Sequence, residues 1–234
     1  AGSEASVDAG PEAGEPAAVG TLLSVESFRV GNAAQSGLAR VAVGADGSRV
    51  VGFTFTAPTT ILGTTVTGQG GLDIGVAKID PSGKLAWAKA FGGAGDDRLF
   101  GLAVDDAGEV YISGDFESSS VTFEAARARS GTVHAPFLAK LAHDSWKALK
   151  SVTFDVASNA GGRCTSVAAR AGVIAVGCSL DGPAGTIALD TGGAANVAEP
   201  PTNAGTAFFF LAELDPTSLG ARWFNALGAF GADR

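Results

Sequence analysis

The chain has 234 residues, 46% of them hydrophobic, which is enough for one or two domains with a sizeable apolar core. Its formal net charge of −8 argues against non-specific nucleic-acid binding and against docking to an anionic membrane surface, because both need clustered Lys and Arg. No apolar run reaches the roughly 18 residues that a transmembrane helix needs. The 34 glycines and many short apolar runs indicate frequent turns, and therefore favour β-structure.

Residues 1–20 consist mainly of Ala, Gly, Glu, Ser and Pro. Such a segment buries too little surface to offset its ordering entropy, so we expect a flexible acidic tether ahead of a folded region at 21–234. The chain begins at Ala1 without an initiator Met, and the tether resembles the region that follows the lipidated cysteine of a bacterial lipoprotein. We therefore expect a secreted, cell-surface or periplasmic protein, with lipid anchoring as an open alternative.

A strand–turn–strand passage occurs three times in the folded region, at residues 37–52, 101–114 and 166–177. Each passage is a short apolar strand, a turn containing glycine, and a second strand that ends on glycine. The closing glycines, Gly52, Gly114 and Gly177, are 62 residues (114 − 52) and 63 residues (177 − 114) apart. This regular spacing indicates an internal structural repeat.

A second strand–turn–strand element follows each passage, at residues 74–87, 136–146 and 209–223. In the first unit its turn runs from Asp80 to Gly83, where Pro81 presets φ and Gly83 accepts a positive φ. Each unit then ends in a glycine-rich stretch closed by arginine, at 91–98, 158–163 and 230–234.

Each unit therefore holds about four strands, with bounds at 37–98, 99–163 and 164–234. Repeated four-stranded antiparallel units predict an all-β fold of the β-propeller type, with about three blades present. A stacked β-solenoid is the second interpretation, because solenoid repeats are usually much shorter.

The repeat resembles the bacterial SBBP β-propeller repeat, most clearly at residues 91–116 and 137–141. The similarity covers about residues 21–234, and the third unit departs from it most, with Ser166 in place of the leading glycine and a shortened turn. The resemblance implies an extracytoplasmic protein of several repeats, in a family whose members mostly have no assigned activity.

Residues 22–31 resemble the last strand of the first unit at 85–92, so we expect one extra N-terminal strand beyond the three units. A closed propeller needs at least four blades. We therefore expect either that the chain is a fragment or that identical chains complete the ring between them.

The chain has two cysteines, Cys164 and Cys178. If a hairpin turns at Ala171 and Gly172, the two cysteines lie directly opposite each other on one face, which predicts a disulfide and an oxidising compartment. Two buried free thiols are the alternative. No histidine lies nearby in the sequence, so metal ligation is the weakest interpretation.

Charged residues recur where, in a propeller, loops converge near the central channel. These loops join the fourth strand of one blade to the first of the next, and the second strand to the third. The candidate ligand-binding residues are Asp96, Asp97, Arg98, Asp115, Glu117, Arg163, Asp233 and Arg234. They suit a cation, a sugar or a peptide; the alternative is that they end strands and pair locally across blades.

No other motif indicates a catalytic or metal site. Residues 105–109 contain three carboxylates, but the counterpart turns have one or none, so we expect a hairpin turn and not a calcium loop. The two histidines, His134 and His143, are expected to be exposed and inert, since no nucleophile motif accompanies them. The three tryptophans, Trp87, Trp146 and Trp223, are expected at one position of the fourth strand, packed between blades.

The sequence therefore favours a binding or scaffold module outside the cell that is not an enzyme and needs no cofactor. Its partner, a protein or a carbohydrate, is not identified, and nucleic acid is not expected. One alternative is part of a propeller hydrolase or lyase whose active site is completed by blades outside this chain. The other is a surface adhesin stabilised by Ca²⁺.

Overall fold

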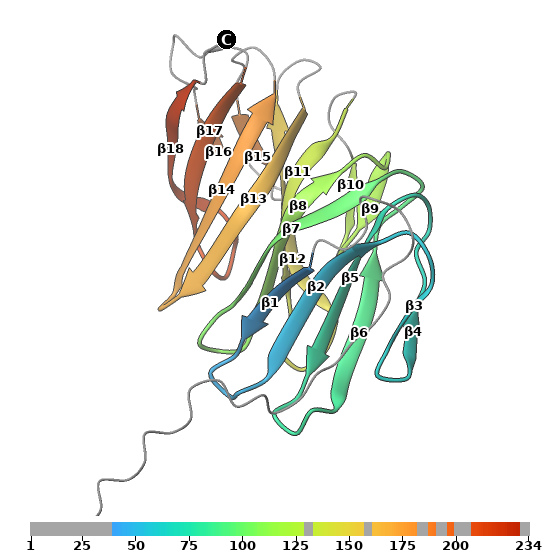
Figure 1. Ribbon diagram of the computed structural model, residues 1–234. Coiled ribbons are helices and arrows are strands. Elements are labelled where there is room, and N and C mark those ends of the chain that lie inside the picture. The colour runs from blue at the N-terminus through green and yellow to red at the C-terminus, as the bar shows by residue number, and fades with distance from the viewer. Residues whose placement is uncertain are drawn as a thin grey trace, which may run out of the picture.

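The computed structural model describes residues 39–128, 133–156, 161–181, 187–190, 196–198 and 207–229. Every regular element within these ranges is a β-strand (Figure 1), and none of the described residues forms a helix that could cross a membrane. The expected tether, the extra N-terminal strand, Asp233 and Arg234 lie outside the described residues.

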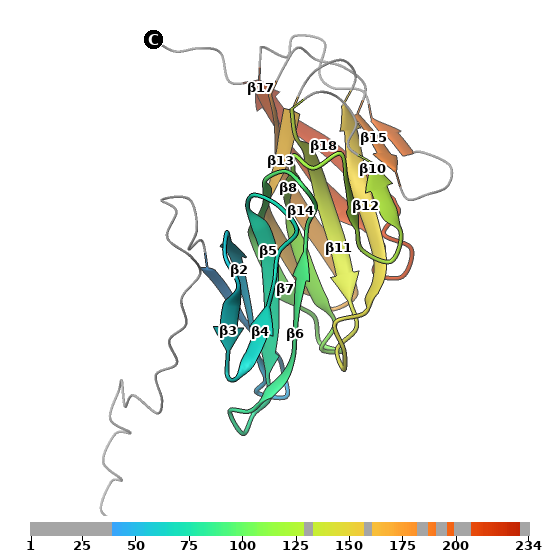
Figure 2. The ribbon, with the colours of Figure 1, turned by 90° about the vertical axis from the view of Figure 1, so that its right-hand side faces the viewer.

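The first repeat unit forms a four-stranded antiparallel sheet in the order β1-β2-β5-β6. Its strands are β1 (Ala39–Val43), β2 (Arg49–Phe55), β5 (Asp73–Ile79) and β6 (Leu85–Phe91). A hairpin of β3 (Thr59–Ile61) and β4 (Thr64–Val66) is inserted between β2 and β5, and β4 lies beside the edge strand β6 (Figure 2).

The second unit repeats this arrangement with β7, β8, β11 and β12. Its strands are β7 (Asp97–Val104), β8 (Val110–Phe116), β11 (Ala135–Leu141) and β12 (Ala148–Val156). The inserted hairpin consists of β9 (Ser120–Thr122) and β10 (Ala126–Ala128). The last residues of the predicted first unit, Asp97 and Arg98, belong to the first strand of this sheet.

The third unit forms the sheet β13-β14-β17-β18. Its strands are β13 (Gly161–Arg170), β14 (Val173–Asp181), β17 (Ala207–Leu214) and β18 (Ala221–Ala229). Its inserted hairpin, β15 (Ile187–Asp190) and β16 (Asn196–Ala198), leaves this sheet and pairs β15 with β12, so the second sheet becomes six-stranded. The predicted antiparallel four-stranded units are confirmed, while the inserted hairpins were not predicted.

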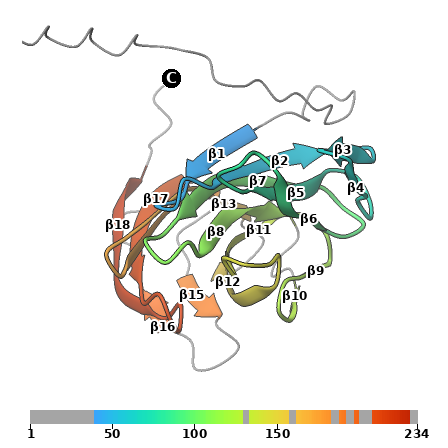
Figure 3. The ribbon, with the colours of Figure 1, turned by 90° about the horizontal axis from the view of Figure 1, so that it is seen from below.

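The three sheets stack face to face, and their first strands β1, β7 and β13 lie side by side. From this line the sheets fan out without closing a ring among the described residues (Figure 3). We call the face that a sheet turns toward the next sheet its forward face, and the opposite face its rear face.

Two apolar cores fill the junctions between sheets. In the first, Val50, Val76 and Trp87 of the first forward face pack with Ile112 and Phe137 of the second rear face. The second core joins the second forward face to the third rear face through residues such as Tyr111, Leu138, Ile174, Val176 and Ala212. Burying a large apolar side chain stabilises by roughly 1.5–3 kcal/mol, so these shared cores hold the stack together.

The predicted disulfide is present between Cys164 of β13 and Cys178 of β14. The two residues are direct cross-strand partners, and the hairpin turns at Ala171 and Gly172 as expected. Both turn residues have positive φ, 52° and 74°, which matches the tight hairpin turns that favour glycine.

Candidate functional site

Five of the predicted site residues come together where the second and third sheets meet. Asp96 precedes β7, Arg98 lies in β7 opposite Asp115 of β8, Glu117 follows β8, and Arg163 lies in β13. These residues stand at the end of the sheets from which the inserted hairpins leave. We call them the arginine–carboxylate cluster.

Arg98 organises the cluster by contacting three carboxylates. Its Nη2 donates to Asp96 Oδ2 at 2.9 Å and its Nη1 to Glu117 Oε1 at 2.6 Å, while Asp115 Oδ1 lies 3.6 Å from Nη1. Burial opposes the charge on Arg98, but the three carboxylates outweigh it and raise the pKa of the guanidinium above its ordinary value. Such charge-assisted contacts fix the guanidinium plane and, with it, the two partner carboxylates.

Asp115 is the unusual group of the cluster. Its side chain is 1% exposed, and neither carboxylate oxygen accepts a hydrogen bond from any residue that the structure describes. Arg163 Nε lies 4.0 Å from Oδ2, so Asp115 stands between an arginine of its own sheet and one of the next. Burial raises the pKa of Asp115 to about 7, although both arginines act to lower it.

The repeat position that Asp115 occupies holds a different residue in each unit. Its counterpart in the first sheet is Thr54, whose Oγ1 accepts a hydrogen bond from Leu99 N of the following sheet at 3.2 Å. The counterpart in the third sheet is Ser179, which is paired with Arg163 as Asp115 is with Arg98. In the first sheet a hydroxyl at this position is therefore enough to bond the next sheet. A buried carboxylate adds a desolvation cost instead, and ionisable groups with such shifted pKa values are concentrated at functional sites.

Asp97 is buried between two loops and does not join the arginine–carboxylate cluster. It is fully buried, and its carboxylate accepts hydrogen bonds from Gly93 N at 2.7 Å, Ser118 Oγ at 2.7 Å and Ser118 N at 3.2 Å. Burial raises the pKa of Asp97, while these hydrogen bonds oppose the rise. The contacts tie the loop before β7 to the loop after β8.

Asp73 is a buried carboxylate that the sequence did not single out. Its Oδ2 accepts hydrogen bonds from Gln69 N and Gly70 N, and its Oδ1 has no partner among the described residues. Burial raises the pKa of Asp73, with the nearby charge of Asp97 adding to the effect. A single Asp at the start of an apolar strand has no sequence signal that separates it from an ordinary strand end.

The described residues contain no group of three His, Cys, Asp or Glu side chains placed to hold a metal ion. The turn at 105–109 is a hairpin turn, as predicted. Asp105 Oδ1 accepts from Ala107 N and Glu109 N, and Asp105 Oδ2 accepts from Tyr111 Oη at 3.0 Å. These bonds occupy the carboxylate within its own turn.

Two further expectations need correction. His134 is 7% exposed, so the expectation that it lies exposed is wrong, whereas His143 is exposed. Trp87 and Trp223 do occupy one position of the fourth strand, but Trp146 precedes β12 and is exposed. Trp87 is buried between sheets, whereas the exposed Trp146 ring lies 4.5 Å from Lys89 Nζ of the first sheet. Trp223 lies on the forward face of the third sheet, which no described sheet covers.

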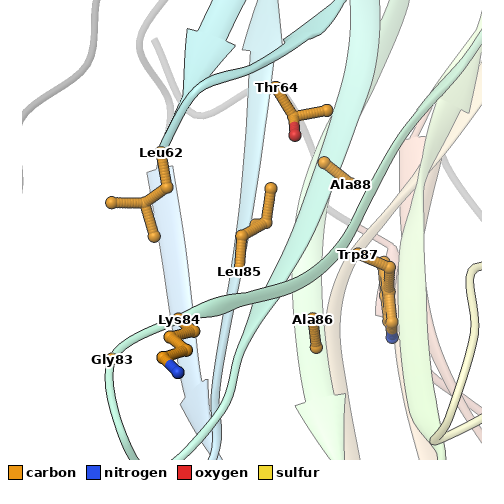
Figure 4. Close-up of a pocket in the computed structure, with 8 residues that line it drawn as sticks. All are labelled: Leu62, Thr64, Gly83, Lys84, Leu85, Ala86, Trp87 and Ala88. Carbon is orange, nitrogen blue, oxygen red and sulfur yellow. The ribbon is translucent and has the colours of Figure 1, made fainter.

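A groove of about 550 Å³ lies between the tip of the β3–β4 hairpin and the edge strand β6 (Figure 4). Its lining is mixed and includes the apolar Leu62, Leu85 and Ala88 beside Thr64 and Lys84. In the second sheet the counterpart of Ala88 is Ser151, whose N–H donates to Glu124 and whose carbonyl accepts from Arg127. The groove contains none of the predicted site residues.

A comparison with models of known protein families finds no match for this chain. A search of curated proteins finds no match either. The relation to the SBBP repeat therefore stays a prediction from the residues.

Proposed function

We propose that the chain is an extracytoplasmic binding or scaffold module of the β-propeller type, related to the SBBP repeat proteins. Three sheets of one topology, with their first strands side by side and with apolar cores between them, support this architecture. The Cys164–Cys178 disulfide supports an oxidising compartment.

The arginine–carboxylate cluster is the proposed recognition surface. The observation that carries the proposal is that Arg98 donates hydrogen bonds to both Asp96 and Glu117. Because Arg98 holds Asp96 and Glu117 in place, these half-exposed carboxylates, 36% and 38% accessible, present fixed acceptors to a ligand. Arg163 adds a donor that is 42% accessible, and its guanidinium lies 5.8 Å from the Phe100 ring. A partner protein with basic side chains, or a carbohydrate with several hydroxyls, offers the matching groups.

The test compares three proteins on a glycan array and on an array of basic peptides. We expect the wild type to bind a subset of probes and the Glu117→Gln, Arg163→Met double variant to lose that binding by roughly tenfold or more. A matched control, Asp144→Asn, changes an exposed carboxylate in the β11–β12 turn. Equal binding by the double variant and the wild type would remove the cluster from the proposal.

One observation favours a second candidate, the propeller hydrolase or lyase. A carboxyl with a pKa of about 7, as at Asp115, exchanges protons near neutral pH and so suits acid–base chemistry. We place this function second because the side chain is 1% exposed, so a substrate reaches it only after the junction opens. Hydrolysis or elimination by the wild type that Asp115→Asn abolishes would reverse the order.

A further inference from the structure

The stack has two outer faces, the rear face of the first sheet and the forward face of the third, and both expose apolar side chains. Val41 and Val43 of β1 are 65% and 67% exposed, and Trp223 of β18 is 44% exposed. Their counterparts at the first internal junction are covered: Leu102 and Val104 pack against its core, and Trp87 is 7% exposed. Val41, Val43 and Trp223 are thus residues whose counterparts a neighbouring sheet covers. The rest of the first rear face is partly covered already, because Phe53, Phe55 and Ala77 form a third core with the β3–β4 hairpin.

At each internal junction a lysine on the forward face reaches the next sheet. Lys78 of β5 donates through Nζ to the carbonyl of His143, at 2.8 Å, in the turn between β11 and β12. Lys140 of β11 donates to the carbonyl of Pro216, at 3.0 Å, in the turn between β17 and β18. The two lysines occupy the same position of the third strand, and the two carbonyls the same position of the following turn.

The third sheet breaks this pattern, because Glu213 stands where Lys78 and Lys140 stand. Strand pairing places Glu213 beside Trp223, as it places Lys78 beside Trp87. Glu213 Oε2 accepts a hydrogen bond from Trp223 Nε1 at 3.0 Å, and Oε1 lies 3.6 Å from Arg222. A carboxylate cannot donate to a carbonyl, so this face does not fit the rear face of a sheet like the second or the third.

The first sheet departs from the repeat on its rear face in the complementary sense. Arg49 of β2 occupies the position of Val110 and Ile174, which are buried in the internal junctions. Its Nη2 donates to the carbonyl of Asp80 at 2.9 Å, one residue before the turn position whose carbonyl receives a lysine at the internal junctions. Arg49 therefore places a positive charge on this face, beside the turn that faces a lysine at the internal junctions.

We infer that the forward face of the third sheet docks onto the rear face of the first sheet of a second copy of this chain, with Glu213 against Arg49. Glu213 replaces a lysine on one face and Arg49 replaces an apolar residue on the other, so the two faces carry opposite charges. Neither internal junction has this combination, so it pairs the third sheet with the first. Two copies of three sheets make six, which lies within the four to eight blades of known propellers, and both junctions of the ring are then identical. The inference rests on the proposed propeller architecture but not on the proposed ligand site.

Sedimentation of the 234-residue chain over a range of concentrations tests the docking. A dimer of twice 23.1 kDa is expected. Arg49→Glu and Glu213→Arg should each raise its dissociation constant by roughly tenfold or more, since each places like charges together, and the double variant should bring it back to near the wild-type value. Asp144→Lys, which reverses an exposed charge in the middle sheet, should leave the dimer unchanged.

Circular dichroism and thermal melting of each variant separate loss of docking from loss of folding. A folded chain that stays at 23.1 kDa at every concentration would overturn the docking, and would make Arg49 and Glu213 solubilising charges on faces that stay open. A dimer that neither reversal weakens would also overturn it, because another surface would then hold the copies together. None of these outcomes depends on ligand binding by the arginine–carboxylate cluster, so the two proposals fail independently.

Discussion

Arg163 Nε of β13 lies 4.0 Å from Asp115 Oδ2 of β8. This contact joins the third sheet to the second, at the end of the sheets from which the inserted hairpins leave. Asp115 is shared between Arg163 and Arg98, which occupy equivalent positions of their sheets. The junction therefore carries a carboxylate between two guanidinium groups where the first junction has a hydroxyl.

Asp115 should make stability fall as pH rises through the weakly acidic range. In the unfolded chain its carboxyl loses its proton near pH 3.8, whereas in the folded chain its pKa is about 7. Between these values the folded state holds one more proton, so the free energy of unfolding decreases as pH rises and levels off above pH 7, a total effect of about 4 kcal/mol. Chemical denaturation between pH 4 and pH 8 measures the slope.

Asp115→Asn removes this titrating proton and should flatten the profile. A residual slope of the same sign is expected from Asp73 and Asp97, whose pKa values burial also raises. If the variant and the wild type have the same pH profile, Asp115 does not titrate as described.

Arg163→Met should raise the pKa of Asp115 further above its ordinary value. Arg163 favours the charged carboxylate, so removal of its charge leaves the burial effect less opposed. The side-chain carboxyl carbon of Asp115, followed by NMR as a function of pH, reports this midpoint directly. Arg163→Lys keeps the charge and is the matched control; an unchanged midpoint in Arg163→Met would show that the arginine contributes little.

Much of the fold was predictable because the repeat carries its own register. The glycine spacing indicated three units of similar length, and the short turn at Ala171 placed Cys164 opposite Cys178. The glycines themselves are not all equivalent, because Gly114 stands one strand position beyond Gly52 and Gly177. The inserted hairpins were not predictable, since β3, β4, β9, β10 and β16 have three residues each, too few for a periodic pattern. The pairing of β15 with β12 depends on the stacking of two units and has no local signal.

The proximity of Arg98, Asp115 and Arg163 was predictable, but the different surroundings of Asp97 and Asp115 were not. Topology alone places Arg98, Asp115 and Arg163 at one end of the sheets. The sequence could not separate Asp97, which hydrogen bonds satisfy locally, from Asp115, which they do not. The difference arises because Ser118 lies within hydrogen-bond distance of Asp97, whereas Asp115 faces Arg98 at 3.6 Å. Only the three-dimensional arrangement of the strands and loops decides these neighbours.

Arg127→Ala should destabilise the second sheet by about 3 kcal/mol. Arg127 is 7% exposed, contacts Glu124 at 2.6 Å, and donates to both the hydroxyl and the carbonyl of Ser151. Burial acts to raise the pKa of Glu124, but hydrogen bonds from Ser151 and Arg127 outweigh it and lower the pKa. The variant leaves this carboxylate charged and without its cation.

Denaturant unfolding at pH 7 measures the loss, with Arg170→Ala as an exposed control that should change stability by less than about 0.5 kcal/mol. Because the folded pKa of Glu124 is lowered, its contribution is present above the pKa of the unfolded chain and disappears as pH falls through the folded value. The difference between Arg127→Ala and the wild type should therefore shrink at low pH. A cost that is equal at pH 7 and at low pH would assign the effect to packing instead.

Trp87 and Trp223 occupy the same position of the fourth strand, but Trp87 is 7% exposed and Trp223 is 44% exposed. The pair therefore tests whether the outer face of the third sheet is open. Trp87→Ala should cost about 3–5 kcal/mol, because it opens a cavity in a packed junction. Trp223→Ala should cost the dilute, monomeric chain about 1 kcal/mol or less, yet raise the dissociation constant of the dimer. Denaturation at low concentration and sedimentation at high concentration separate the two effects. Equal destabilisation by both variants in the monomer would mean that Trp223 is already covered within its own chain, and the outer face would then not be open to a second copy.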